Sequence, residues 1–242
     1  RNPGAPTFLR IKVKPKRRFI AKLMMRELGL PFRQMPDDFD GWADDTIRKL
    51  GVHATTHIDA PVHYGKFSAG QPAQTIEAIP LERCIGPGVV LDMSHKSDGD
   101  AITVSDLEAE LDRTGAKITD GTITLIRTDR DRFHHSPDFW KRGTGMSAAA
   151  TEWLIDQGSK VMGIDQWGWD VPFHTHIAQA KAENRRDLFW EAHRVGIRKT
   201  YWHMEQLTNL SALPAFGFTV CVLPLKLAGA SAAPARVIAM ID

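Results

Sequence analysis

The sequence has little of three features that would mark common classes of protein. It contains two cysteines, Cys84 and Cys221, in 242 residues, which is too few for a disulfide framework, and neither belongs to a C-x-x-C pair. It has no apolar run near the roughly 20 residues that a membrane-spanning helix needs. Lys and Arg number 31 against 29 Asp and Glu, and this small surplus argues against nucleic acid as the main partner, because phosphate binding needs concentrated positive charge.

What remains is the composition of an ordinary globular protein. Apolar residues make up 43% and charged residues 25% of the chain, which excludes disorder and collagen-like structure. The length suits one domain with a substantial core, so we expect a single domain over residues 1–242. The low cysteine count favours a reducing compartment, and we expect a cytoplasmic protein.

Hydrophobic periodicity and cap residues predict alternating helices and strands. Residues 1–16 are typical of an irregular arm or edge strand, and the acidic residues 34–48 of a surface loop. Helices are predicted over residues 17–28, 103–114, 147–158 and 187–195, and strands over residues 84–93, 122–128, 160–165, 218–227 and 235–242. This alternation favours an α/β protein with a mixed sheet.

One short stretch concentrates ionisable side chains. It reads HATTHIDAPVH and contains His53, His57, Asp59 and His63. A straight strand would hold His53 and His57 about 13 Å apart, at roughly 3.3 Å per residue. Two nitrogens that bind one ion at about 2.1 Å cannot be so distant, so we expect a helical turn or sharp bend between them. Because Pro61 blocks continuation of a helix, the pattern predicts a bend that gathers His53, His57 and Asp59.

Two neutral imidazoles and one carboxylate form a frequent hydrolytic metal set that leaves coordination positions open. No cysteine is near, so Mn²⁺ or Zn²⁺ fits best, and such an ion brings the pKa of water toward neutrality. His63 could then accept the proton. For any one of these histidines a surface loop would be the simpler interpretation; for the four residues together we favour a metal site.

The stretch resembles the H-x-G-T-H-x-D-x-P-x-H signature of the cyclase-like metal-dependent hydrolases, which include bacterial kynurenine formamidase and isatin hydrolase. Thr55 replaces the family glycine, as in the isatin-hydrolase branch. The resemblance runs from about residue 50 to the end and is weakest over residues 1–45. It implies a swivelling β/β/α-type domain with a mixed, barrel-like sheet, and a homodimer or homotetramer.

The same resemblance implies roles for individual residues. His53, His57 and Asp59 would bind the metal, and His63 would be the catalytic acid and base. His193, followed twelve residues later by Glu205, would complete a second metal position, with Glu205 also catalytic. One or two ions are therefore expected.

Further candidates lie outside this set. Trp167 and Trp169 flank a glycine and could form a wall for an aromatic substrate. His203 alternates with Glu205 along a strand without support from the family pattern. Exposed loops are the favoured interpretation of two histidine pairs, His174 with His176 and His134 with His135, and core or interface packing that of the other tryptophans, Trp140, Trp153, Trp190 and Trp202. Phe32 could reach across a dimer.

These observations favour a metal-dependent hydrolase that opens an amide C–N bond in a small cyclic or aromatic substrate. A lactone or ester hydrolase on the same scaffold is an alternative, because attack by activated water does not depend on whether oxygen or nitrogen leaves. A non-catalytic metal-binding or interaction protein is an alternative of another class.

Overall fold

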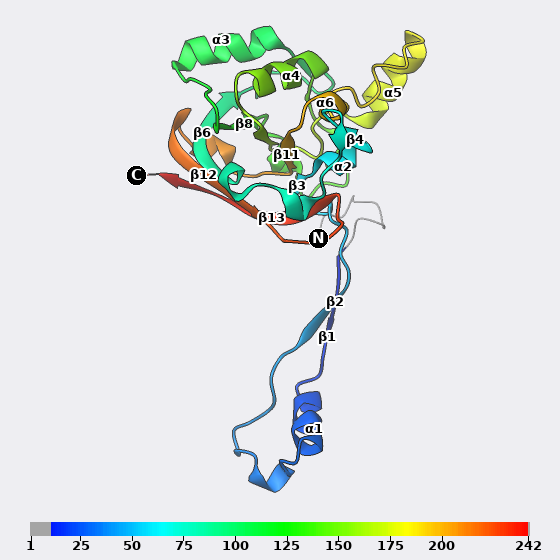
Figure 1. Ribbon diagram of the computed structural model, residues 1–242, viewed down its shortest axis with the longest axis vertical. Coiled ribbons are helices and arrows are strands. Elements are labelled where there is room, and N and C mark those ends of the chain that lie inside the picture. Colours follow the sequence, from blue (N-terminus) through cyan, green and yellow to red (C-terminus); the bar gives the residue numbers. More distant parts are fainter. Residues whose placement is uncertain (1–10, 242) are drawn as a thin grey trace. The chain divides into compact units, whose positions relative to one another are not determined.

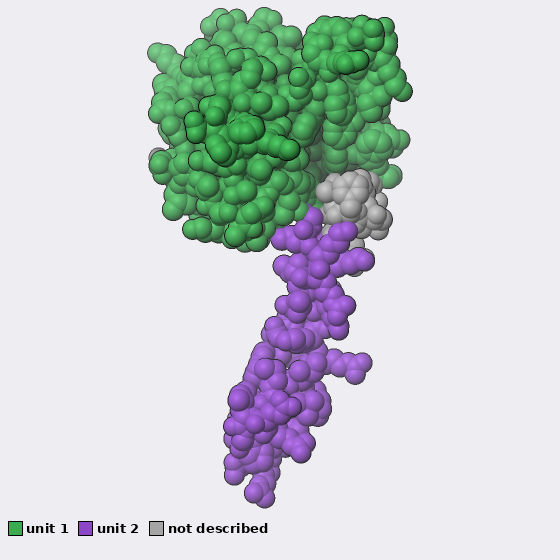
Figure 2. Space-filling view, turned by 45° about the vertical axis from the view of Figure 1, so that its right-hand side comes forward, with its two compact units in different colours: residues 1–5, 52–242 green, residues 6–51 purple. Residues whose placement is uncertain are grey.

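The structure is a computed structural model that describes residues 11–241. It divides into two compact units, one within residues 52–241 and one within residues 11–51 (Figure 2). Each unit is described by itself below. Residues 1–10 of the expected arm, and residue 242 of the last predicted strand, lie outside the described residues. The expectation of a single domain stays a prediction.

The smaller unit is a two-stranded ribbon with a helix. Strand β1 (Lys12–Pro15) pairs antiparallel with β2 (Asp45–Lys49), and helix α1 (Phe19–Glu27) and the 3₁₀ turn η2 (Phe32–Gln34) lie between them in sequence. The predicted helix over residues 17–28 is confirmed. The loop predicted over residues 34–48 is wrong where β2 begins, because backbone pairing with β1, rather than burial, stabilises this exposed strand.

The larger unit is built on a closed seven-stranded barrel in the order β10-β11-β3-β13-β12-β6-β8. Its strands are β3 (His57–Asp59), β6 (Ile85–Asp92), β8 (Ile123–Arg127), β10 (Val161–Ile164), β11 (Trp202–Glu205), β12 (Phe216–Pro224) and β13 (Ala232–Ile241). Neighbours from β6 through β8 and β10 to β11 are parallel, and the remaining pairs are antiparallel. The α/β class and the mixed, barrel-like sheet are thus confirmed.

Helices cover one side of this barrel, with α3 and α4 above β6 and β8 (Figure 1). The helices are α2 (Pro61–Tyr64), α3 (Val104–Thr114), α4 (Ala148–Asp156), α5 (Phe173–Ala182) and α6 (Val195–Arg198). Thr103 and Asp106 form a capping box at the start of α3, and Gly115 ends it in the left-handed conformation. Ser147 caps α4 by accepting the backbone N–H of Ala150. The helices predicted over residues 103–114 and 147–158 are thus confirmed.

Short elements complete the unit. They are β4 (Phe67–Ser68), β5 (Gln71–Pro72), β7 (Ala101–Ile102) and β9 (Gly145–Met146), with 3₁₀ turns η3 (Ile76–Ala78), η4 (Leu81–Arg83), η5 (Arg130–Phe133), η6 (Phe139–Lys141) and η7 (Leu210–Ala212). The buried apolar residues form two clusters. One, which includes Leu107, Leu154 and Ile164, lies beneath the helices, and the other includes Ile58, Met204 and Val220.

The helix predicted over residues 187–195 is wrong, and α5 was missed. Residues 186–194 form turns, apart from a bend at residue 188, in which Trp190 takes a positive φ of 59°. The carboxylate of Asp170 accepts the backbone N–H groups of Ala192 and His193. Because a side chain outside the segment holds these donors, local helical periodicity does not decide its conformation.

Candidate metal centre

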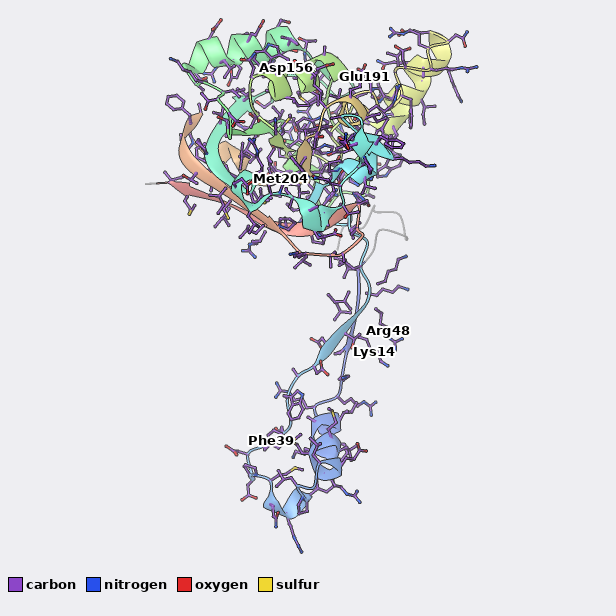
Figure 3. The ribbon with its side chains drawn as sticks, in the orientation of Figure 1. Lys14, Phe39, Arg48, Asp156, Glu191 and Met204 are labelled. Carbon is purple, nitrogen blue, oxygen red and sulfur yellow. The ribbon has the colours of Figure 1, made fainter. Side chains whose placement is uncertain are left out.

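Two adjacent strands place four ionisable side chains on one face of the barrel sheet. Strand β3 pairs with β11 so that Asp59 lies opposite His203 and His57 lies opposite Glu205. Side chains alternate along a strand, so Ile58 and Met204, which are also opposite each other, point to the other face. Both are fully buried in an apolar cluster, and Figure 3 labels Met204 within the barrel.

The segment before β3 adds His53 to this face. Residues 52–56 form turns and bends, and the Nδ1 atom of His53 lies 2.9 Å from Oδ1 of Asp59. The Nε2 atom of His57 lies 3.2 Å from the same oxygen. His53, His57 and Asp59 therefore form one group of mutually close donor atoms, and the bend expected from their spacing is present.

A second group shares Asp59 with the first. It joins Asp59, His193, His203 and Glu205, all of them buried. The Nε2 atom of His193 lies 3.8 Å from Oδ2 of Asp59 and 3.5 Å from Oε1 of Glu205. The structure thus brings His193 and Glu205, distant in sequence, to the motif. It also adds His203, which was not included in the predicted ligand set; its alternation with Glu205 on one strand was the available signal.

Hydrogen bonds to residues outside the two groups orient the side chains that could bind a metal. Nδ1–H of His57 donates to the backbone carbonyl of Thr55 over 2.7 Å, and Nδ1–H of His193 donates to Asp170 over 2.5 Å. The backbone N–H of Trp169 donates to Oε1 of Glu205. In both histidines the unprotonated Nε2 is left facing the carboxylates, which is the usual arrangement of histidines that bind a metal.

The donor set fits a divalent ion. Nε2 of His57 and both carboxylate oxygens of Asp59 are buried without a hydrogen-bond partner among the described residues, an arrangement that costs free energy unless a cation satisfies them. Burial opposes ionisation of Asp59, but electrostatic interaction with the imidazoles of His57 and His63 holds its pKa well below the ordinary value. Burial likewise disfavours a charge on His203, yet Asp59 and Glu205 raise its pKa to about 9. The site therefore favours positive charge.

His63 lies at the edge of the first group. Pro61 is the first residue of α2, which carries His63 so that its Nε2 atom is 3.6 Å from Oδ2 of Asp59. Its side chain keeps 25% exposure, whereas that of Asp59 keeps 1%. Burial, reinforced by the charges of His53 and His193, lowers the pKa of His63 to about 4 against the opposing charge of Asp59. His63 is therefore a neutral base at neutral pH.

The aromatic surroundings differ from the expectation for Trp169. Its ring has no exposed surface and stacks on His203 at 5.0 Å between ring centroids, which corresponds to support of the donors rather than to a substrate wall. Trp167 is partly exposed and contacts Phe173 edge to face. Trp190, expected in core or interface, stacks on His193 at 4.4 Å and meets the edge of His63 at 5.2 Å.

The remaining candidate residues are outside both donor groups. His174 is exposed on α5, and His176 is buried there and accepts the backbone N–H of Trp190. His134 and His135 contact each other. Phe32 stacks on Phe19 within the smaller unit.

A closed mixed barrel that carries two adjoining groups of His, Asp and Glu side chains fits the class of metal-dependent hydrolases. The chain belongs to the family described as putative cyclase, whose model matches residues 13–171. The match therefore begins well before residue 50, where the resemblance in the sequence starts. Among the described residues, none of the helices is both long and apolar enough to span a membrane.

Several relatives are hydrolases by name. The chain is 27% identical over 211 residues to isatin hydrolase of Roseibium aggregatum, covering 79% of this chain and 73% of that protein. It is 31% identical over 192 residues to kynurenine formamidase of Bordetella petrii, covering 78% and 77%. A crystal structure of an isatin hydrolase bound to the product analogue thioisatinate is similar, with a TM-score of 0.69 and 26% identity over 86% of this chain and 79% of that one.

Proposed function

We propose that this protein is a hydrolase that opens a non-peptide amide C–N bond in a small cyclic or aryl substrate, with one or two ions of Mn²⁺ or Zn²⁺. The observation that carries the proposal is the cluster of buried, unpartnered donors at His57 and Asp59, next to the second donor group. The names of the relatives support the class of bond, since isatin hydrolase and kynurenine formamidase are among them.

The donor residues divide into two sets in this proposal. His53, His57 and Asp59 would hold one ion, and His193 with Glu205 and the shared Asp59 would hold a second. A bound divalent ion polarises the substrate carbonyl and lowers the pKa of water toward neutrality. In this proposal Glu205 also orients water or substrate, and its Oε2 lies 3.7 Å from Nε2 of His57 in the first set.

His63 is the proposed proton carrier. It is neutral and partly exposed at the edge of the donor cluster, so it can accept a proton from the attacking water. The same Nε2–H then donates to the leaving nitrogen, which must be protonated to depart as an amine. An alkoxide leaving group depends less on this second proton transfer. If His63→Ala lost amide cleavage but kept ester cleavage, the result would support both His63 as the proton carrier and an amide as the substrate.

The aromatic residues suggest the shape of the substrate. The half-buried ring of Trp190 contacts both His193 and His63, and Trp167 remains a proposed contact as well. An aromatic ring in the substrate would gain stacking energy and orientation from such neighbours.

The test is proton release from isatin, N-formylkynurenine and an unsaturated lactone, each with and without chelator and after restoring Mn²⁺ or Zn²⁺. We expect hydrolysis of an amide substrate that chelator abolishes and metal restores. His57→Ala should lose metal and activity, and His95→Ala, at an exposed histidine outside the site, should lose neither. Hydrolysis of the lactone alone would favour the ester alternative. Bound metal with no hydrolysis of any compound would favour a non-catalytic role.

We also propose a homodimer or homotetramer in the cytoplasm. The outer faces of β12 and β13 expose apolar side chains, including Leu223 at 51%, Ile238 at 48% and Met240 at 47%. Ile238 lies opposite Cys221 and Met240 opposite Thr219, so these residues share one face of the two-strand ribbon. Exposed apolar area of this kind is typical of a subunit interface, and light scattering after size-exclusion chromatography measures the assembly.

A further inference from the structure

We infer that the two proposed metal positions are chemically unequal, and that His203 makes the difference. His203 is a fourth protein ligand that closes the position formed by Asp59, His193 and Glu205. The position formed by His53, His57 and Asp59 keeps room for water and substrate. This inference rests on the proposed function for the presence of metal.

The first support is the spacing of the four donors. Nε2 of His203 lies 3.3 Å from Oδ2 of Asp59 and 3.3 Å from Oε1 of Glu205. Nε2 of His193 lies 3.8 Å and 3.5 Å from the same two oxygens. Ligands at about 2.1 Å from a tetrahedral ion are about 3.4 Å from one another. These four separations are close to that value, and all four donor atoms lie within 4.8 Å of one another.

The second support is the difference in burial between the two positions. The side chains of His203 and His193 are 0% and 5% exposed, and that of Glu205 is 10% exposed. At the other position the side chain of His53 keeps 21% exposure. Solvent and substrate therefore reach the position of His53 more readily than that of His203.

The third support is the proton on the far nitrogen of His203. The hydroxyl of Tyr64 donates to the backbone carbonyl of Asp59 over 3.5 Å and lies 3.1 Å from Nδ1 of His203. With its one proton on that carbonyl, the hydroxyl would accept a hydrogen bond from Nδ1–H of His203. In the neutral form, which a bound ion would select over the protonated one, Nε2 of His203 carries a lone pair that faces Asp59 and Glu205, as a metal ligand requires.

The two metal positions would then have different roles, one structural and one catalytic. Structural zinc sites have four protein ligands, whereas catalytic sites have three and leave a position for water. An ion held by His203 would fix the shared Asp59 and Glu205 in place, and the ion held by His53 would face the substrate. His63, which contacts the ring of His53 at 4.2 Å, is on the substrate side.

The test is titration of the metal-free protein with Co²⁺, followed by its visible absorption, because tetrahedral Co²⁺ absorbs far more strongly than five- or six-coordinate Co²⁺. We expect the first equivalent to give the intense tetrahedral band and a second to add weaker absorption. In His203→Asn the shorter side chain can stay near Tyr64 but cannot reach the ion. The intense band should be lost, or should need about 100-fold more Co²⁺, and competition with a zinc-binding dye should show the same loss for Zn²⁺.

His95→Asn is the matched control at an exposed histidine and should titrate as the unsubstituted protein does. Tyr64→Phe keeps every ligand and removes only the hydroxyl that fixes the proton on His203. It should keep the band and weaken binding about 10- to 100-fold, which tests the inference even if His203→Asn does not fold. An unchanged titration in both variants would overturn the inference, as would a first equivalent without the tetrahedral band. If the Co²⁺ titrations give the expected tetrahedral band but the protein hydrolyses none of the substrates, the proposed function alone would be overturned.

Discussion

The two faces of the β3–β11 strand pair are equally buried but are stabilised by opposite means. On one face Ile58 and Met204 pack in an apolar cluster. On the other, one residue away along each strand, Asp59 and His203 lie opposite each other with unpartnered carboxylate oxygens between them. Removal from water stabilises the first face. Burial of the second face costs free energy until a cation binds its carboxylates. The apolar face therefore stabilises the fold, and the polar face forms the candidate metal site.

The largest expected effect comes from Asp59, which belongs to both donor groups. Asp59→Asn keeps the shape and removes the charge, so metal affinity should fall at least about 100-fold, since loss of an outer partner alone costs 10- to 100-fold. Activity should fall with it. In the presence of chelator the variant should melt below the unsubstituted protein, because His57 and His203 lose the buried carboxylate that they face. Metal analysis and circular dichroism melting measure the two effects. A variant that retains its metal would contradict the division between the faces.

The reverse pattern is expected at Ile58, one residue earlier. Ile58→Ala removes buried methyl groups and leaves a cavity, which should lower the free energy of unfolding by about 2–5 kcal/mol. Met204→Ala, on the facing strand, is the matched comparison. Both are measured by urea unfolding in chelator, and the folded fraction of each should bind as much metal as the unsubstituted protein. Loss of metal in proportion to loss of stability would show that the two faces are not separable.

A smaller effect is expected at Asp170, which acts through His193. Its carboxylate accepts Nδ1–H of His193 and two backbone N–H groups. In Asp170→Asn an amide oxygen can accept only part of this set, so metal affinity should fall about 10- to 100-fold while the ligands remain. Competition with a chelating dye gives the affinity. An unchanged affinity would mean that backbone turns alone position His193.

Local spacing indicated His53, His57 and Asp59 from the sequence, and the family resemblance indicated His63, His193 and Glu205. Non-local strand pairing, which the sequence does not specify, adds His203. His53, His57 and Asp59 share an eleven-residue stretch whose spacing requires a bend, and the structure has one. The inclusion of His203 depends on the register of β11 against β3, which no local pattern specifies. The same holds for Trp190, because its contact with His193 depends on turns held by Asp170, where the sequence indicated a helix.

The barrel strands and capped helices were predictable for a related reason. The apolar runs of β6, β8 and β10 are each continuous in sequence, and Thr103 and Ser147 mark helix starts by their own hydrogen bonds. Strand β2 was missed because all of its side chains are exposed. Without a buried face there is no alternation of apolar and polar residues to indicate a strand.

The smallest effect is expected for a substitution at Asp98, the partner of the buried Arg130. This pair is a buried charge with a protein partner, in contrast to the buried Asp59, which needs a metal. Arg130 is buried and donates through Nε to Asp98 over 2.9 Å, while its other nitrogens donate to backbone carbonyls. Asp98→Ala should lower the free energy of unfolding by about 1 kcal/mol at pH 7, since its carboxylate is one-third exposed and partly screened. Asp112→Ala, at an exposed position of α3, is the control and should have little effect.

The pH dependence of this difference follows from the pKa of Asp98. Burial alone would raise that pKa, but the hydrogen bond and charge of Arg130 hold it below the ordinary value of 3.8. A lowered pKa in the folded state means that the stabilisation is complete above pH 3.8 and is lost as the pH falls through the folded-state value. The gap between the unsubstituted protein and Asp98→Ala in urea unfolding should therefore be constant from pH 7 to pH 5 and narrow below pH 4. A gap that widened on acidification would mean that Asp98 takes up a proton on folding and that Arg130 lacks a charged protein partner.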